Sequence, residues 1–260
     1  MSDLAVGVLP WAIVLSALVV YSIRVMLSGR AKSARADRDG GSILLSMHFL
    51  EFAAWFLSPI GRLVVRFGGT PDGVTWFSIL PNLGAGVALA LGRFGLATLL
   101  GTIAAFCDSL DGMVARLSGM SSEAGETLDA MVDRYAESAF FVGLLLHYRD
   151  SLAVCALVAV AMVGAFMVSY TSAKAEAQGV EPPRGLMRRS ERATYLLVGV
   201  GLTTFTNALV AEPAPLIVRD APMMIAIALM AVIANVSTFR RVSLIRQALR
   251  TRELLNKDAR

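Results

Sequence analysis

Four aspartates within a short, otherwise apolar stretch are the residues best suited to do chemistry. Asp108 and Asp111 are three residues apart, and Asp129 and Asp133 are four apart, so on helices each pair shares one face. Carboxylates clustered among apolar residues stay ionised only when cations neutralise them. Carboxylate oxygens suit Mg²⁺ or Mn²⁺, and two such ions balance the four negative charges. The spacing therefore predicts a site for two divalent cations.

The residues beside the aspartates indicate that the metal site also holds a phosphate. Gly112 follows Asp111 and lets a ligand approach the helix backbone. Arg116 can bind a phosphate through two hydrogen bonds, and Gly125 leaves room at the start of the next helix. A single aspartate here could simply cap or solvate a helix end, but that explanation does not account for the whole group.

The elements that position these residues are predicted to be membrane helices. The chain has 260 residues, 56% of them hydrophobic, and a mean hydropathy of +0.63. This composition predicts an all-α, polytopic membrane helix bundle with a six-helix core and one extra N-terminal transmembrane helix. The expected spans are residues 9–27, 73–92, 95–117, 123–147, 151–177, 191–210 and 222–239. The short loop 118–122 would bring the two aspartate pairs together.

The chain divides into four expected parts. Residues 1–41 form the N-terminal transmembrane helix and a polar linker, and residues 42–69 form an interfacial amphipathic helix that we expect Pro59 to end. Residues 70–245 form the six-helix core, which opens on a turn with Asp72 near the helix N-cap. Residues 246–260 form a basic cytoplasmic tail.

The distribution of basic residues predicts the orientation. Lys and Arg are concentrated in the linker, in loop 178–190 and in the tail, which places these segments and the aspartates on the cytoplasmic side of the cell's inner membrane. The net charge is +4, and the basic residues cluster between the apolar runs. This arrangement fits binding to an anionic membrane surface rather than to nucleic acid. A divalent-cation transporter is an alternative, but it leaves Gly112 and Arg116 without a role.

The pattern resembles the signature of the CDP-alcohol phosphatidyltransferase family. Asp108-x2-Asp111-Gly112-x2-Ala115-Arg116-x8-Gly125-x3-Asp129-x3-Asp133 matches it at every defining position, over 26 residues with eight fixed identities. The resemblance implies transfer of a phosphatidyl group from CDP-diacylglycerol to the hydroxyl of a second alcohol, with release of CMP. It also implies a homodimer.

The resemblance assigns roles to individual residues. All four aspartates would hold the metals, and Asp133 would also be the general base for the attacking hydroxyl. The implied CDP-binding residues are Asp72, Thr75, Asp108, Gly112, Arg116 and Ser122.

The acceptor is predicted from a second polar group. Its members are Ser169, Lys174, Arg189, Arg192 and Arg241. Several cations facing one pocket suggest a phosphorylated, anionic alcohol. The segments SYTSAKAEAQG and GLMRRSERA are similar to the branch of the family that uses inositol 1-phosphate, although Arg188 and Ser172 depart from that branch. Glycerol 3-phosphate or another alcohol remains an alternative acceptor.

Overall fold

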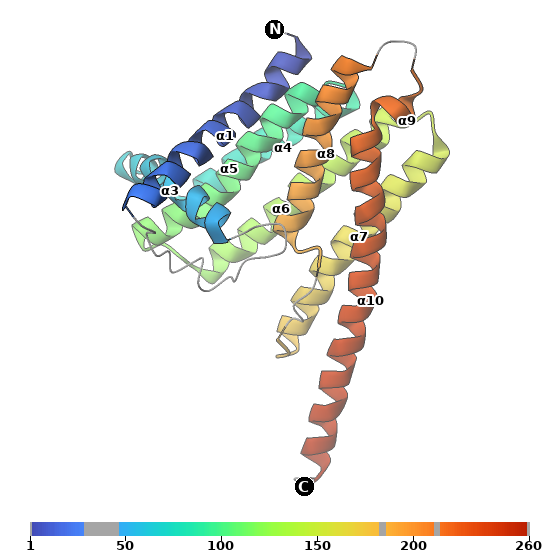
Figure 1. Ribbon diagram of the computed structural model, residues 1–260. Coiled ribbons are helices and arrows are strands. Elements are labelled where there is room, and N and C mark those ends of the chain that lie inside the picture. The colour runs from blue at the N-terminus through green and yellow to red at the C-terminus, as the bar shows by residue number, and fades with distance from the viewer. Residues whose placement is uncertain (1, 29–46, 182–185, 211–213, 259–260) are drawn as a thin grey trace.

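The computed structural model describes residues 2–28, 47–181, 186–210 and 214–258, and within these ranges it is helical and contains no strand. The all-α prediction is therefore confirmed. The helices are α1 (Asp3–Ser28), α3 (Met47–Arg66), α4 (Pro71–Ala90), α5 (Phe94–Ser118), α6 (Glu123–His147), α7 (Leu152–Ala177), α8 (Arg189–Leu209), the short α9 (Leu216–Arg219) and α10 (Ala221–Asp258) (Figure 1).

The chain is a multi-pass membrane protein. In the described ranges five helices, α1, α4, α5, α7 and α10, are long and apolar enough to cross a membrane. Large apolar side chains such as Leu80, Val163 and Val232 are exposed on their outer faces, as expected for contact with lipid. The helices α6 and α8 are of similar length but carry more charged residues, several of which face the site described below.

Helix α4 packs against both α5 and α6. Its contact with α6 is close because two glycines meet there. A Cβ added to Gly86 would lie 2.4 Å from the carbonyl oxygen of Ala139, and one added to Gly143 would lie 2.3 Å from the carbonyl oxygen of Gly86. Small residues let helix backbones approach in this way. The contact sets the distance between α4 and the aspartate-bearing face of α6.

Helix α10 packs on α7 and α8 and extends beyond the other helices at the end opposite the N terminus (Figure 1). Ala161 and Ala165 on α7 and Met230 and Ala234 on α10 belong to one buried cluster. The apolar run of this span ends near residue 239, and the sequence predicts a basic tail after it. Instead one helix continues through the tail to Asp258, because no Gly or Pro interrupts the chain after Pro222.

Helix α1 is docked along α5 and α8 rather than lying apart from the core. The Asp3 carboxylate accepts hydrogen bonds from the backbone N–H groups of Gly95 (2.7 Å) and Leu96 (3.2 Å), at the first turn of α5. A Cβ on Gly7 would lie 2.8 Å from the Cα of Gly95, so the two backbones touch. The extra helix thus caps a core helix that carries two of the site aspartates.

Helix α3 differs from the sequence expectation at Pro59. The helix continues through this residue and ends at Arg66. A proline inside a helix removes a single backbone donor, which an otherwise well-packed helix can tolerate. Two contacts hold α3 against its neighbours. Gly61 lies against Met113 of α5, and Glu51 accepts a long hydrogen bond (3.4 Å) from the Tyr21 hydroxyl of α1.

Candidate active site

The site lies where α5 ends and α6 begins. Gly119 ends α5 in the left-handed conformation (φ 68°), which favours glycine. Ser122 caps α6, its Oγ accepting a hydrogen bond from the N–H of Gly125 at 3.0 Å. The chain therefore reverses within a few residues. The two aspartate pairs come together beside α4, as the sequence predicted.

Three of the four aspartates form a compact group. Asp108, Asp111 and Asp129 each offer a carboxylate oxygen, and these oxygens lie within 4.8 Å of one another. Asp111 is buried and held in place, since its Oδ2 accepts a hydrogen bond from Thr75 Oγ1 at 2.9 Å and its Oδ1 accepts one from the N–H of Gly112 at 2.5 Å. Hard oxygen ligands at this separation fit a divalent cation.

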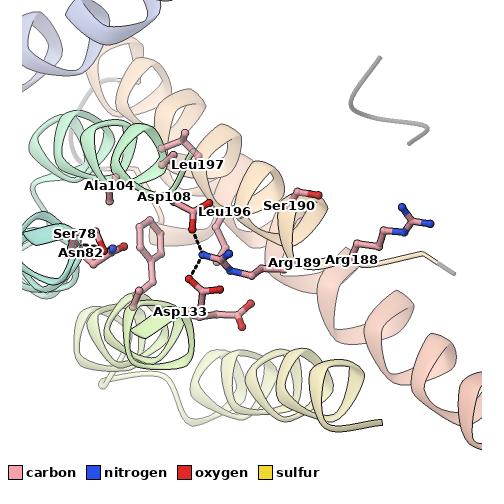
Figure 2. A pocket seen from close by; sticks show the side chains of 16 residues that line it. Ser78, Asn82, Ala104, Asp108, Asp133, Arg188, Arg189, Ser190, Leu196 and Leu197 are labelled. Atoms are coloured by element: carbon pink, nitrogen blue, oxygen red, sulfur yellow. Dashed lines mark hydrogen bonds and ion pairs between the residues drawn. The ribbon is translucent and has the colours of Figure 1, made fainter. Parts of the chain in front are cut away.

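Asp133 is linked to this group through an arginine. Arg189, at the start of α8, donates to Asp108 Oδ1 at 2.5 Å and forms an ion pair with Asp133 Oδ1. Figure 2 shows the Arg189 guanidinium between the two carboxylates. Arg134 is more distant, with its Nη1 4.0 Å from Asp133 Oδ2. A cation from α8 thus balances part of the charge of the cluster.

Two cavities meet at the aspartates. The smaller has a volume of about 170 Å³ and lies between α4, α5 and α6, with Asp111 and Asp129 in its wall. The larger has a volume of about 400 Å³ and lies between α4, α5, α6 and α8, with Asp108 and Asp133 in its wall. The carboxylates therefore separate two cavities that could each hold a substrate.

The smaller cavity collects most of the residues predicted to bind CDP. Its lining includes Asp72, Thr75, Gly112, Arg116 and Ser122. Of the predicted set, Asp108 lies instead in the wall of the larger cavity.

The start of α4 matches the sequence expectation that Asp72 lies near the helix N-cap. Thr70 caps the helix through its Oγ1, which accepts from the N–H of Gly73 at 3.1 Å, while Asp72 lies in the first turn. Threonine followed by Pro71 favours this arrangement, because proline suits the first position of a helix. Asp72 Oδ1 lies near Gly125, where an added Cβ would be 3.6 Å away. Asp72 and Gly125 both line the smaller cavity, so the carboxylate lies close to the start of α6 there.

The residues predicted to bind the acceptor are dispersed. Arg189 lines the larger cavity, but Ser169, Lys174, Arg192 and Arg241 are not in its wall. Lys174 is exposed near the end of α7. Arg241 is buried and donates to Ser172 Oγ at 2.7 Å, which ties α10 to α7.

Arg192 is almost completely buried, with 1% of its surface exposed. Its Nε and Nη2 donate to the two carboxylate oxygens of Glu137 at 2.6 and 2.9 Å, and Nη2 also donates to Ser169 Oγ at 3.0 Å. Nη1 donates to the carbonyl oxygen of Met187 at 3.0 Å. The guanidinium is thus engaged by protein groups on α6, α7 and the segment before α8.

Three further polar residues of the site are not among those predicted from the sequence. Glu137 follows Asp133 by one helical turn and lines the larger cavity, as do Ser78 and Asn82. The spacing of four residues from Asp133 was a usable signal for Glu137. Ser78 and Asn82 were detectable only as polar residues within an apolar span.

Comparison with known proteins places the chain among membrane lipid enzymes. The phosphatidylinositol phosphate synthase of Corynebacterium glutamicum is 36% identical over 168 residues, which cover 62% of this chain and 75% of the relative. The synthase of the same name from Cutibacterium acnes is 33% identical over 160 residues, covering 60% of this chain and 77% of the relative.

Solved structures give the same result. The phosphatidylinositol phosphate synthase of Mycobacterium tuberculosis with CDP-DAG bound superposes with a TM-score of 0.63 at 26% identity, covering 73% of this chain and 92% of the other. Its complex with manganese and citrate gives a TM-score of 0.64, also at 26% identity, with 73% and 88% coverage. The pattern of the CDP-alcohol phosphatidyltransferase family matches residues 69–232, which include all four aspartates. The chain belongs to the CDP-alcohol phosphatidyltransferase family.

Proposed function

We propose that this protein transfers the phosphatidyl group of CDP-diacylglycerol to a hydroxyl of inositol 1-phosphate and releases CMP. The bond from the hydroxyl oxygen to the phosphorus forms, the bond from that phosphorus to the oxygen of CMP breaks, and the hydroxyl proton leaves to a base. The observation that carries the proposal is the placement of four aspartates between two cavities in a chain of this family. That family membership gives no support to the alternative of a cation transporter.

The smaller cavity is proposed to hold the CDP moiety. Gly112 leaves room for a phosphate at the helix, and Arg116 can contribute a guanidinium to it. Thr75 fixes the orientation of Asp111 at the same wall. The M. tuberculosis relative, whose structure contains CDP-DAG, supports CDP-diacylglycerol as the donor.

The metal-binding residues are proposed to be Asp108, Asp111, Asp129 and Asp133. The compact spacing of the first three oxygens fits this role, and the manganese complex of the M. tuberculosis relative supports it. Divalent cations, when bound, neutralise the diphosphate charge and make CMP a better leaving group. The aspartates themselves set the position of that charge relative to both cavities.

Asp133 is proposed to be the general base. It lies in the wall of the larger cavity, whereas five of the six predicted CDP-binding residues line the smaller one. A base must lie within hydrogen-bond reach of the attacking hydroxyl, and an acceptor in the larger cavity satisfies that requirement. Arg189, paired with Asp108 and Asp133, supplies positive charge near an anionic acceptor.

The phosphorylated acceptor is supported by the cations around α8 and by the relatives' names. Arg188 and Arg189 line the larger cavity, and Arg241 lies on the helix that packs beside α8.

We also propose that the protein is a homodimer in the inner membrane with its site facing the cytoplasm. The loop charges support this orientation.

An assay of CMP release tests the function. Purified protein in detergent is supplied with CDP-diacylglycerol and, separately, with inositol 1-phosphate, glycerol 3-phosphate, inositol or serine, with and without Mg²⁺ or Mn²⁺. We expect metal-dependent CMP release with inositol 1-phosphate. If CMP is released with glycerol 3-phosphate but with no other alcohol, the proposed acceptor is wrong and the proposed type of reaction is right. If no alcohol gives CMP release, the proposal is refuted.

A further inference from the structure

The larger cavity has a polar edge that the aspartate motif does not explain. Ser78 and Asn82 lie one turn apart on α4 and both line this cavity. Figure 2 shows them on the opposite side of the cavity from Arg188, which points away from the carboxylates. Helix α4 is apolar enough to span a membrane. Polar side chains within such a helix are costly unless they meet a partner or face a polar cavity.

Asn82 retains hydrogen-bonding capacity toward the cavity. Its Nδ2 donates to the carbonyl oxygen of Ser78 at 2.8 Å, and the structure, as far as the chain is described, gives the carboxamide no other hydrogen bond. An asparagine side chain can donate two hydrogen bonds and accept through its oxygen. One N–H donor and the oxygen are therefore open to a ligand.

A second asparagine shows the contrasting, structural arrangement. Asn235 on α10 donates through Nδ2 both to Ala231 O at 2.8 Å and to Val160 O at 3.1 Å. Its donors join α10 to α7, and it lines neither cavity. Asn82 makes the same bond to the carbonyl four residues earlier but does not bridge to another helix. The comparison separates a ligand-facing asparagine from one that holds helices together.

The in-line geometry of phosphoryl transfer indicates that the acceptor occupies the larger cavity. In phosphoryl transfer the attacking and leaving oxygens lie roughly in line on opposite sides of the phosphorus. Gly112 and Arg116 place the leaving CMP in the smaller cavity, and Asp133 faces the larger one. An alcohol attacking from that side enters the cavity bounded by Ser78 and Asn82.

We propose, as a consequence of the function proposed above, that Asn82 binds an uncharged hydroxyl of the acceptor alcohol and thereby determines which phosphorylated alcohol is used. Ser78 supports this group, since its backbone carbonyl orients the carboxamide. The wall of this cavity combines charged side chains at the aspartate cluster with apolar residues such as Ala104 and Phe140, which offer a hydroxyl no hydrogen bond. A site that hydrogen-bonds a hydroxyl discriminates strongly against an analogue that lacks it.

The test compares Asn82→Ala with the control Asn235→Ala. Initial rates of CMP release are measured against inositol 1-phosphate and its monodeoxy analogues at saturating CDP-diacylglycerol. For Asn82→Ala we expect the acceptor KM to rise about 10-fold while the KM for CDP-diacylglycerol stays within about 2-fold, and for Asn235→Ala we expect neither to change. With the wild-type protein, the KM for one deoxy analogue should be about 10-fold higher than the KM for inositol 1-phosphate. With Asn82→Ala, the KM values for that analogue and for inositol 1-phosphate should be the same.

The outcomes separate this inference from the function on which it rests. If the wild-type protein uses inositol 1-phosphate and Asn82→Ala leaves its KM unchanged, or raises only the KM for CDP-diacylglycerol, the role of Asn82 is refuted. If the wild-type protein uses a different alcohol, the proposed acceptor is wrong, and the same KM comparison with that alcohol decides the role of Asn82. Should Asn82→Ala fail to fold, Asn82→Asp, which keeps the size and one acceptor oxygen, is measured instead, and it must still alter the pattern of deoxy analogues.

Discussion

Arg192 and Glu137 form a two-point ion pair, Nε to Oε1 at 2.6 Å and Nη2 to Oε2 at 2.9 Å, that joins α8 to α6 one turn beyond Asp133. The arginine is 1% exposed, so its charge depends on this partner. Arg189 and Asp133, one turn earlier on the same two helices, form the neighbouring ion pair. The two pairs together set the separation of α6 and α8 at the wall of the larger cavity.

Glu137→Gln is expected to destabilise the protein strongly. The substitution leaves the Arg192 guanidinium buried without a compensating charge, which in other proteins costs about 3–5 kcal/mol. Thermal unfolding of the detergent-solubilised variant should show a clearly lower Tm. The double variant Glu137→Gln/Arg192→Gln should lose less stability than the sum of the single variants, because neither charge is then left alone. Additive losses would show that the pair is not coupled.

The aspartate site could be predicted from sequence because its determinants are local. Asp108, Asp111, Asp129 and Asp133 are fixed by helical spacing and one short loop, and the structure brings them together as expected. Within the described residues, five of the seven expected spans are helices apolar enough to cross a membrane, whereas α6 and α8 carry more charge and are not among them. The continuation of α10 beyond residue 239 was not evident from the sequence. The residues after 239 are mostly polar or charged, so no hydrophobic run marks this part of the helix.

The acceptor side could not be predicted in the same way. The sequence predicts Arg192 as a ligand for the acceptor, yet its guanidinium is held by Glu137 and Ser169, which are 55 and 23 residues away in the chain. Whether a cationic side chain is buried against protein groups or faces a cavity depends on the orientation of three packed helices about their own axes. Apolar residues face both lipid and core in a membrane helix, so hydropathy does not reveal the face that Asn82 occupies.

Asp133→Asn is expected to abolish CMP release without loss of the fold. Asparagine has nearly the same size but cannot take a proton from the acceptor hydroxyl. CMP release should fall to the background rate, while Tm stays close to that of the wild-type protein and CDP-diacylglycerol still binds. Activity above about one tenth of the wild-type rate would remove Asp133 from the role of base.

Thr75→Val should weaken metal binding. The Thr75 hydroxyl donates to Asp111 Oδ2 at 2.9 Å, and groups that orient a metal ligand typically contribute about 10- to 100-fold to affinity. We expect at least about a 10-fold higher Kd for Mn²⁺, measured by electron paramagnetic resonance of free Mn²⁺. Thr98→Val is the control, since Thr98 is a buried threonine of α5 whose hydroxyl bonds the Phe94 carbonyl. Equal affinities in both variants would show that Thr75 does not orient Asp111.

Asp3→Ala should lower stability and leave substrate binding unchanged. The carboxylate caps α5 from the extra helix, and losing a helix cap costs about 0.5–2 kcal/mol. The Tm should fall, while the KM values for both substrates remain those of the wild-type protein. Asp150→Ala, at an exposed turn residue, serves as the control and should not change Tm. A changed KM in Asp3→Ala would instead link α1 to the site.

Gly86→Ala should reduce activity because the added methyl group pushes α4 and α6 apart. The added methyl group would meet the backbone carbonyl of Ala139 at 2.4 Å, and backbone cannot move aside as a side chain can. Overpacking of this kind costs about 1–3 kcal/mol, and here it displaces Thr75 and Asn82 relative to Asp133. We expect a lower kcat together with a lower Tm. Gly84→Ala is the matched control on the same helix, because its added methyl group meets only the flexible end of Leu100 at 3.0 Å. Equal losses of kcat in the two variants would show that close approach of α4 to α6 is not what the site requires.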